Sequence, residues 1–366
     1  MHVRGRYLVN LVRLGFLGIL LFLISACQER IVSPEPPVEL ILRTWENDMP
    51  ADLFTGFTQK TGISVRPEPY ESQEDSIADL TAGKSADILV MDSRFIPSLI
   101  SNKLISVIDR TNVPNFRYIS PGFRGLSFDS QNQYSVPYQW GTTGIVYRRD
   151  LTRRDITKWS DLWDPAFQGK VGLWKGQSRE AIGLTLKMLG YSANSEDPDE
   201  LAAAMAKLME LQPGLVWVET IDPNTVVPGL VDGRLIVTMG YAYDAIEGRK
   251  ENPNIRFVLP AEGAVLWGEH FVIPSTTLHK AQAEALLNFL EEPEVMARIA
   301  NFNFYAVAND GAMPLIADEI RKSPLIYPPE DQLLNSEIIF SISPEAESRY
   351  QSGWAKFTGA VSKDTP

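Results

Sequence analysis

The chain has 366 residues, of which 44% are hydrophobic and 22% are charged, and this balance predicts a folded protein with room for two domains. It carries 34 Lys and Arg against 46 Asp and Glu, so its formal net charge is -12, which argues against a nucleic-acid-binding protein with its typical basic surface. One Cys and three His exclude an intrachain disulfide bond and a cysteine metal cluster, and we expect neither a bound metal nor a cofactor.

The first 26 residues have the pattern of a secretory signal peptide. Three Arg precede an apolar run from Leu14 to Ile24, which is too short to cross a bilayer comfortably. Small residues then lead directly to Cys27, and this arrangement resembles the bacterial lipobox, in which the cysteine becomes the lipidated first residue of the mature protein. Residues 27–38 are polar and proline-rich and are expected to form a tether. We therefore expect a lipoprotein, with an ordinary signal peptide and an unmodified cysteine as the alternative.

From Glu39 onward, short apolar runs alternate with amphipathic segments, which is typical of an α/β fold. Strands are predicted at Glu39–Thr44, Ser64–Pro67, Ala86–Met91, Gly144–Tyr147, Val171–Trp174, Leu215–Val218, Leu235–Met239 and Ile255–Leu259. Helices are predicted from Pro50 up to Gly62, from a capping Ser178 to Leu189, from Asp199 to Leu211 and from His279 to Leu290.

Two long extended runs, Val136–Tyr147 and Val265–Pro274, each contain a central Gly and a Trp. A strand that passes from one sheet into another is expected to look like this. The two runs point to a two-lobed clamp with a hinge of several strands, and a single large sheet remains the alternative.

The sequence contains no recognisable catalytic motif. It has no Gly-x-Ser-x-Gly elbow, no Walker loop, no His-Glu-x-x-His and no Rossmann glycine fingerprint. His270 lies beside Glu269 in the second extended run, but neighbouring side chains of a strand point to opposite faces, so the two are not expected to share a site. We expect no catalytic residues and a protein that is not an enzyme.

Aromatic and acidic side chains gather where several of the predicted strands end, and this is where α/β proteins usually bind ligands. An aromatic face attracts an alkylammonium group by about 2 kcal/mol when water is excluded, and a buried ammonium also needs carboxylates to offset its desolvation. The pattern predicts a pocket for a cationic amine with an apolar spine, although each residue taken singly is equally compatible with a structural role. The aromatic and acidic residues are Trp45, Asp48, Asp92, Glu180, Tyr241, Trp267 and Glu269, and Arg94 and Gln177 lie at the same strand ends as possible ligand-binding or charge-tuning residues.

The body of the chain resembles the bacterial periplasmic spermidine/putrescine-binding proteins, the solute receptors of polyamine ABC importers. The resemblance covers residues 39–357 and is carried, in the same order, by Phe57–Val65, Tyr70–Ser72, Ser135–Gly141, Trp159–Pro165, Arg179–Glu180, Leu189–Ser192 and Glu262–Trp267. It implies a two-lobed periplasmic-binding-protein fold of type II (Venus-flytrap), each lobe a mixed sheet flanked by helices, that closes over a ligand. The implied lobes are 39–142 with 270–313, and 143–269 with 314–360.

The resemblance also implies roles for single residues. Trp45 and Trp267 match aromatics that sandwich the methylene chain of the ligand. Glu180 matches an acid that holds an amine, and Tyr305 matches a cleft tyrosine. Glu269 stands where the family has an aspartate, so the charge is kept on a longer stem.

Other positions depart from the family pattern. Asp48 and Asp92 stand at positions that are usually tyrosine and serine, Gln177 replaces an aspartate, and Tyr241 replaces a tryptophan. Arg94 stands where an aromatic is expected, and a cation there repels a polyamine unless a neighbouring acid neutralises it.

We therefore expect a monomeric, lipid-anchored polyamine receptor in the periplasm that delivers its ligand to an ABC permease. Two alternatives keep the fold and change the cargo. In one, Arg94 clamps the carboxylate of a zwitterion such as an amino acid, and in the other, Tyr241 and Tyr243 bind ferric ion. A further alternative leaves transport altogether and makes the protein an envelope sensor with a vestigial cleft.

Overall fold

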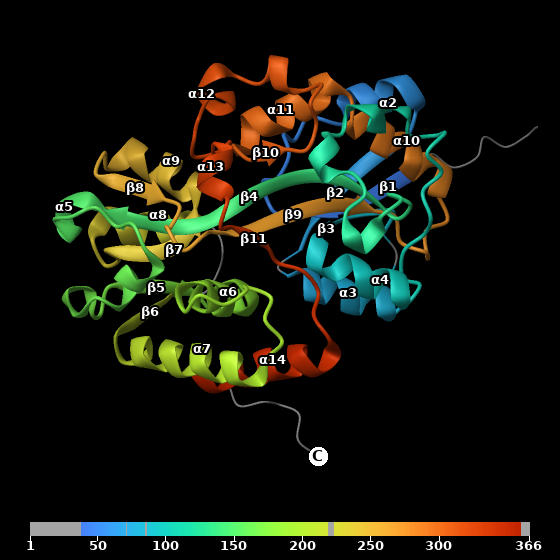
Figure 1. Ribbon diagram of the computed structural model, residues 1–366. Helices are drawn as coiled ribbons and strands as arrows, with labels where there is room; N and C mark the ends of the chain where they lie inside the picture. The colour runs from blue at the N-terminus through green and yellow to red at the C-terminus, as the bar shows by residue number, and fades with distance from the viewer. Residues whose placement is uncertain (1–37, 71, 85, 219–222, 360–366) are drawn as a thin grey trace, which may run out of the picture. The chain divides into compact units, whose positions relative to one another are not determined.

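Two long antiparallel strands, β4 (Ser135–Arg148) and β9 (Val265–Val272), run side by side through the middle of the fold (Figure 1). They correspond to the two extended runs of the sequence. The computed structural model describes residues 38–70, 72–84, 86–218 and 223–359. The predicted signal peptide, Cys27 and the predicted tether up to residue 37 lie outside the described residues.

Two groups of parallel strands flank this central pair. The other strands are β1 (Glu39–Thr44), β2 (Ser64–Pro69), β3 (Ile88–Asp92), β5 (Val171–Trp174), β6 (Leu215–Val218), β7 (Val237–Tyr241), β8 (Ile255–Val258), β10 (Ala306–Val307) and β11 (Glu337–Ile338). Their order is β2-β1-β3-β9-β4-β7-β5-β6, with β8 and β10 also paired to β4 and β11 paired to β9. β9 is antiparallel to β3, and β4 is antiparallel to β7. The central pair therefore joins the β1–β3 group to the β5–β7 group within one hydrogen-bonded sheet.

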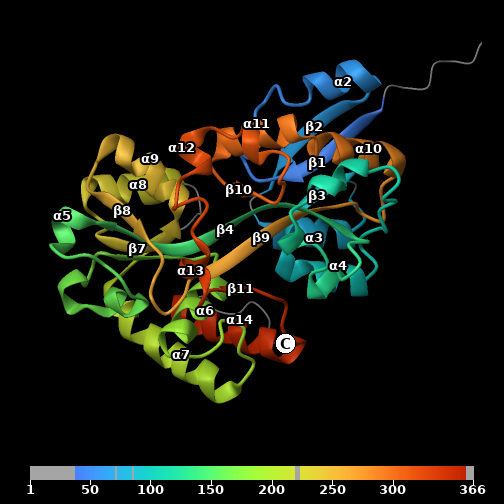
Figure 2. The same ribbon diagram turned by 45° about the horizontal axis from the view of Figure 1, so that its top comes forward.

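Helices cover both faces of each strand group. They are α2 (Thr55–Thr61), α3 (Gln73–Thr81), α4 (Ile96–Ser101), α5 (Arg149–Thr152), α6 (Ser178–Met188), α7 (Pro198–Leu211), α8 (Pro223–Asp232), α9 (Ala242–Glu251), α10 (Lys280–Leu290), α11 (Pro293–Asn303), α12 (Asp318–Arg321), α13 (Glu330–Leu333) and α14 (Pro344–Thr358). Figures 1 and 2 show α2, α10 and α11 on one face of the β1–β3 group, with α3 and α4 on the other. At the β5–β7 group, α8 and α9 lie on one face and α6, α7 and α14 on the other. None of the described helices is long and apolar enough to cross a membrane.

Each strand group has its own hydrophobic cluster. Leu89 and Met91 of β3 are fully buried with Leu99 of α4 in one cluster. Leu173 of β5 and Leu184 of α6 are fully buried in a larger cluster at the other end. Such fully buried apolar strands are expected where helices cover both faces of a parallel sheet.

The predicted elements agree with this fold, and the differences have local causes. β1, β5 and β6 have the predicted bounds. The first helix was expected from Pro50, but residues 50–54 form turns and α2 begins only at Thr55. Ser178 was expected to cap α6, whereas it is the first helical residue and Gln177 is the N-cap.

Candidate functional site

The candidate site lies where the C-terminal ends of β3 and β7 meet the middle of β9 and β4. Asp92 at the end of β3 stands opposite Glu269, and Tyr241 at the end of β7 stands opposite Thr143. Trp267 shares the face of Glu269, because alternate residues of a strand point to the same side. Thr143 pairs with Val265, which lies four residues before Glu269 on β9, so the strand covers about 13 Å between these two levels. We use the term central row for five residues, which are Asp92, Thr143, Tyr241, Trp267 and Glu269.

A buried pair of acids forms one end of the central row. The side-chain amide of Gln139 donates hydrogen bonds to Glu269 Oε2 (2.6 Å) and to Asp48 Oδ1 (3.1 Å). The indole N–H of Trp45 donates to the other oxygen of Glu269. Asn303 Nδ2 also donates to Asp48 Oδ1, at 3.2 Å. The side chains that donate these hydrogen bonds to the two carboxylates are all uncharged.

The charges of these two acids are poorly compensated. Asp48 is 5% exposed and Glu269 is 6% exposed. Burial, together with the nearby charge of Asp48, raises the pKa of Glu269 to about 8. Burial also raises the pKa of Asp48, against the effect of its hydrogen bonds. A cation placed between the two carboxylates would favour their ionised forms.

Glu180 forms the other end of the site. It lies in the first turn of α6, where the hydroxyl of Thr143 donates to its Oε2 and the hydroxyl of Tyr241 donates to its Oε1 at 3.2 Å. Burial raises the pKa of Glu180 to about 7, and the charge of Asp92 acts in the same direction, whereas the charge of Arg94 opposes it. Asp92 also raises the pKa of Glu269, so its charge acts on the acids at both ends of the site.

Aromatic rings line the space between the two ends. The ring of Trp267 lies 5.5 Å from that of Tyr241 and 5.2 Å from that of Tyr305, both edge-on. A narrow cavity of about 10 Å³ lies against these three rings, which is about the space that one water needs. The indole N–H of Trp267 is buried there without a hydrogen-bond partner. The aromatic part of the site is therefore nearly closed.

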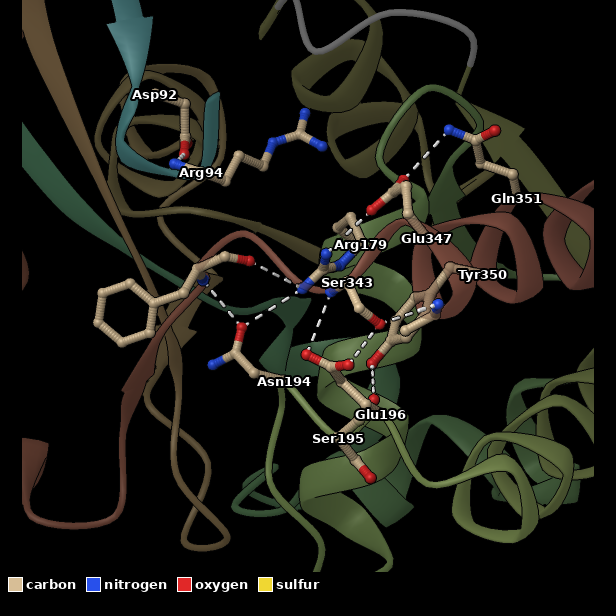
Figure 3. A network of polar contacts seen from close by, with 12 residues as sticks. Asp92, Arg94, Arg179, Asn194, Ser195, Glu196, Ser343, Glu347, Tyr350 and Gln351 are labelled. Atoms are coloured by element: carbon tan, nitrogen blue, oxygen red, sulfur yellow. Dashed lines mark hydrogen bonds and ion pairs between the residues drawn. The ribbon is translucent and has the colours of Figure 1, made fainter. Parts of the chain in front are cut away.

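Arg94 lies at the edge of the site with an acid of its own. Its backbone N–H donates to Asp92 Oδ1 (2.9 Å), and its guanidinium group lies over the ring of Phe95 and pairs with Glu74 at 3.2 Å. Figure 3 shows the Arg94 side chain extending away from the carboxylate of Asp92. Arg94 opposes the rise that burial causes in the pKa of Asp92, but the pKa of Asp92 stays above its ordinary value.

Arg179, the neighbour of Glu180, is turned to the other side of α6. Its guanidinium group pairs with Glu347 (3.2 Å) and donates to Asn194 Oδ1 (3.3 Å) and to the carbonyl of Phe340 (3.1 Å) (Figure 3). These contacts fasten the C-terminal segment to the start of α6. They therefore help to fix the helix turn from which Glu180 enters the site.

Seven of the ten candidate residues come together in two contacting groups, and Asp92, Arg94 and Gln177 belong to neither group. Trp45, Asp48 and Glu269 form the first group, and Glu180, Tyr241, Trp267 and Tyr305 form the second. Gln177 instead uses its backbone carbonyl to accept the N–H of Ala181 at the start of α6.

Sequence reasoning missed the uncharged residues that hold the acids, chiefly Gln139, Thr143 and Asn303. Gln139 and Thr143 lie on the predicted crossing strand, two residues before and two residues after Gly141. This spacing of two indicates that the two side chains share a face of the strand, which the sequence could have shown. His270 faces away from Glu269, as predicted, and its Nε2 lies 3.0 Å from Ser93 Oγ.

Comparisons with known proteins show the family to which the chain belongs. The model of the bacterial extracellular solute-binding proteins matches residues 52–328. The chain is 31% identical over 301 residues to the spermidine/putrescine-binding periplasmic protein of Escherichia coli (strain K12), with 81% of this chain and 85% of the relative covered. It is 29% identical over 305 residues to the putrescine/agmatine-binding protein of Pseudomonas aeruginosa, with 78% and 82% covered.

A solved structure is similar over nearly its whole length. It is the spermidine/putrescine ABC transporter substrate-binding protein of Streptococcus pneumoniae, with a TM-score of 0.77 and 28% identity, and the match covers 88% of this chain and 99% of that one. The expected fold, a two-lobed α/β clamp of the periplasmic-binding-protein type, is confirmed. The exact lobe boundaries stay a prediction.

Proposed function

The chain belongs to the bacterial extracellular solute-binding proteins, and we propose that its solute is a polyamine, which it delivers as a monomer to an ABC permease. The names of the relatives from Escherichia coli and Pseudomonas aeruginosa state that those proteins bind spermidine, putrescine or agmatine. The protein then acts in the periplasm as a binding protein and not as an enzyme. The lipid anchor at Cys27 belongs to the same proposal and rests on the lipobox-like sequence before it.

The observation that carries the proposal is the set of four acids around the central row. Asp48, Asp92, Glu180 and Glu269 all have a pKa above the ordinary value, and burial is the largest cause for each. Acids in this state have too little positive charge around them to offset their burial. A ligand that carries ammonium groups on a methylene chain supplies such charge at both ends of the row.

The rings between the acids suit the apolar part of the same ligand. Trp267 and Tyr241 lie between the pair Asp48–Glu269 and Glu180. Methylene groups next to an ammonium pack well on aromatic faces, and the faces attract the charge itself. In this arrangement the ligand contacts strands of both groups at once, so binding favours the closed clamp.

The zwitterion alternative depends on Arg94 alone. This guanidinium group lies near Asp92 and Glu180, where it would meet the carboxylate of an amino acid. Its ion pair with Glu74 and the four surrounding acids make this reading the weaker one.

Isothermal titration calorimetry with putrescine and spermidine tests the proposal. We expect both amines to bind, and we expect Trp267→Ala to weaken binding about tenfold or more, since an aromatic face contributes about 2 kcal/mol to holding a desolvated ammonium. Trp217→Ala is the control, because Trp217 packs against Trp354 and Phe357 outside the site. No heat with either amine at millimolar concentration would refute the polyamine assignment, and unchanged binding to Trp267→Ala would place the site elsewhere.

A further inference from the structure

A second cavity, larger than the narrow one beside Trp267, lies next to the aromatic part of the site. Its volume is about 440 Å³, within the range of cavities that take small organic ligands. Its wall is formed by the end of β8, the loop that follows it and the segment around α13. The lining residues that matter here are Phe257, Leu259, Pro324, Leu325, Asp331 and Asn335.

One short segment separates this outer cavity from the narrow cavity beside Trp267. Pro324 lines only the outer cavity, and Ile326 lines only the inner one. Leu325 lines both. Leu325 is therefore part of the wall between the two cavities, and its side chain is partly exposed, a state in which side chains change rotamer rapidly.

The chemistry of the outer cavity matches that of the site behind it. Phe257 and Leu259 give it an apolar wall, and Asp331 supplies a carboxylate from α13. Among the described Lys and Arg side chains, none forms an ion pair with Asp331. Asp331 is exposed, so its carboxylate stays hydrated and is open to a cation at the rim of the cavity. An apolar wall beside such an acid favours an alkyl chain that ends in a cation.

We propose that the outer cavity is a subsite for the additional aminoalkyl arm of a longer polyamine such as spermidine, which passes Leu325 and places its terminal ammonium beside Asp331. This inference rests on the proposed polyamine function. Putrescine, which lacks the arm, is held by the central row alone.

Calorimetry with spermidine and putrescine on the full chain tests the subsite. Asp331→Asn removes the acid with little change of shape, and we expect it to weaken spermidine about threefold to tenfold and to leave putrescine unchanged. Leu325→Trp fills the partition, and we expect it to weaken spermidine about tenfold more than putrescine. Leu334→Trp is the control, because Leu334 is 76% exposed and lines neither cavity.

The outcomes separate the subsite from the function on which it rests. The subsite would be overturned if Asp331→Asn left the affinity for spermidine unchanged. It would also be overturned if either variant changed the affinities for spermidine and putrescine by the same factor. Polyamine binding itself would stand in both cases. Failure of the unaltered protein to bind either amine would refute the function itself.

Discussion

Asp92 and Glu269 stand directly opposite each other in the antiparallel pair of β3 and β9. Like charges in this position destabilise a sheet, and burial raises the pKa of both carboxyl groups. The free protein thus keeps an arrangement that costs stability at the point where the proposed ammonium group binds. Binding sites often retain such strain because the ligand relieves it.

Asp92→Asn is expected to raise the stability of the free protein and to weaken polyamine binding. At pH 8.5, where Glu269 is largely ionised, the amide removes the repulsion between the two carboxylates, a gain of about 0.5–1 kcal/mol. The amide oxygen still accepts the backbone N–H of Arg94 as the present cap does. Thermal unfolding and calorimetry measure the two effects. Asp199→Asn, an exposed position of α7, is the control. A variant that is less stable and binds polyamine as before would contradict the role given to Asp92.

The stability of the free protein is expected to fall as the pH rises above about 6.5. Burial holds the pKa of Glu180 at about 7 and that of Glu269 at about 8, above the ordinary value of 4.5, so the folded state binds more protons than the unfolded state until these acids ionise. Their contribution to stability is fully present below pH 4.5 and is lost progressively until the pH has passed these folded-state values. Burial lowers the pKa of His270 to about 3, so this residue makes the stability rise with pH, but only below its ordinary pKa of 6.5.

The melting temperature measures this loss, and we expect it to drop by about 5 °C between pH 6.5 and 8.5. Saturating putrescine should reduce the drop, because a bound cation favours the ionised acids. Glu291 is also buried, and its pKa is raised to about 8. It therefore causes a part of the drop in melting temperature that putrescine does not reduce. Equal pH profiles with and without putrescine would show that the ligand does not meet Glu180 or Glu269.

Gly141→Ala is expected to disturb the site through Trp267. A Cβ at residue 141 would lie 2.3 Å from an indole carbon of Trp267, so the ring must shift. We expect putrescine binding to weaken about tenfold, since the position of the ring determines its contact with the ligand. Gly56→Ala is the matched control, because a Cβ there meets no atom within 4 Å. If the two variants bind alike, the Trp267 ring does not contact the ligand.

The parts of the fold that the sequence predicted are those with a strong local pattern. β5 and β6 are short apolar runs with clear limits, and they have the predicted bounds. The long extended runs around Trp140 and Trp267 were recognised as crossing strands because their glycines and aromatics stand out. Residues at strand ends, such as Asp92 and Tyr241, follow from the general placement of ligands in α/β folds.

The hydrogen-bonding partners of the acids could not be predicted in the same way. Gln139 reaches Glu269 because the pairing of β4 and β9 shifts register between Pro137 and Trp140, and no local pattern reveals such a shift. Asn303 comes from the end of α11, far along the chain. Leu325 lies in a segment without periodicity, so its place between two cavities depends on tertiary packing alone.

Arg94→Gln separates the polyamine from the zwitterion. The guanidinium group opposes the raised pKa of both Asp92 and Glu180, so it lies within reach of their charges, and it repels an ammonium ligand. For a polyamine we therefore expect the variant to bind about threefold to tenfold more tightly, as removal of a like charge near a surface is worth about 1 kcal/mol. For γ-aminobutyrate, the same variant would lose the partner of the carboxylate and bind more weakly. Calorimetry with both ligands measures the difference, and Arg234→Gln, an exposed position outside the site, is the control. A weaker putrescine complex together with a lost γ-aminobutyrate complex would make the zwitterion the solute.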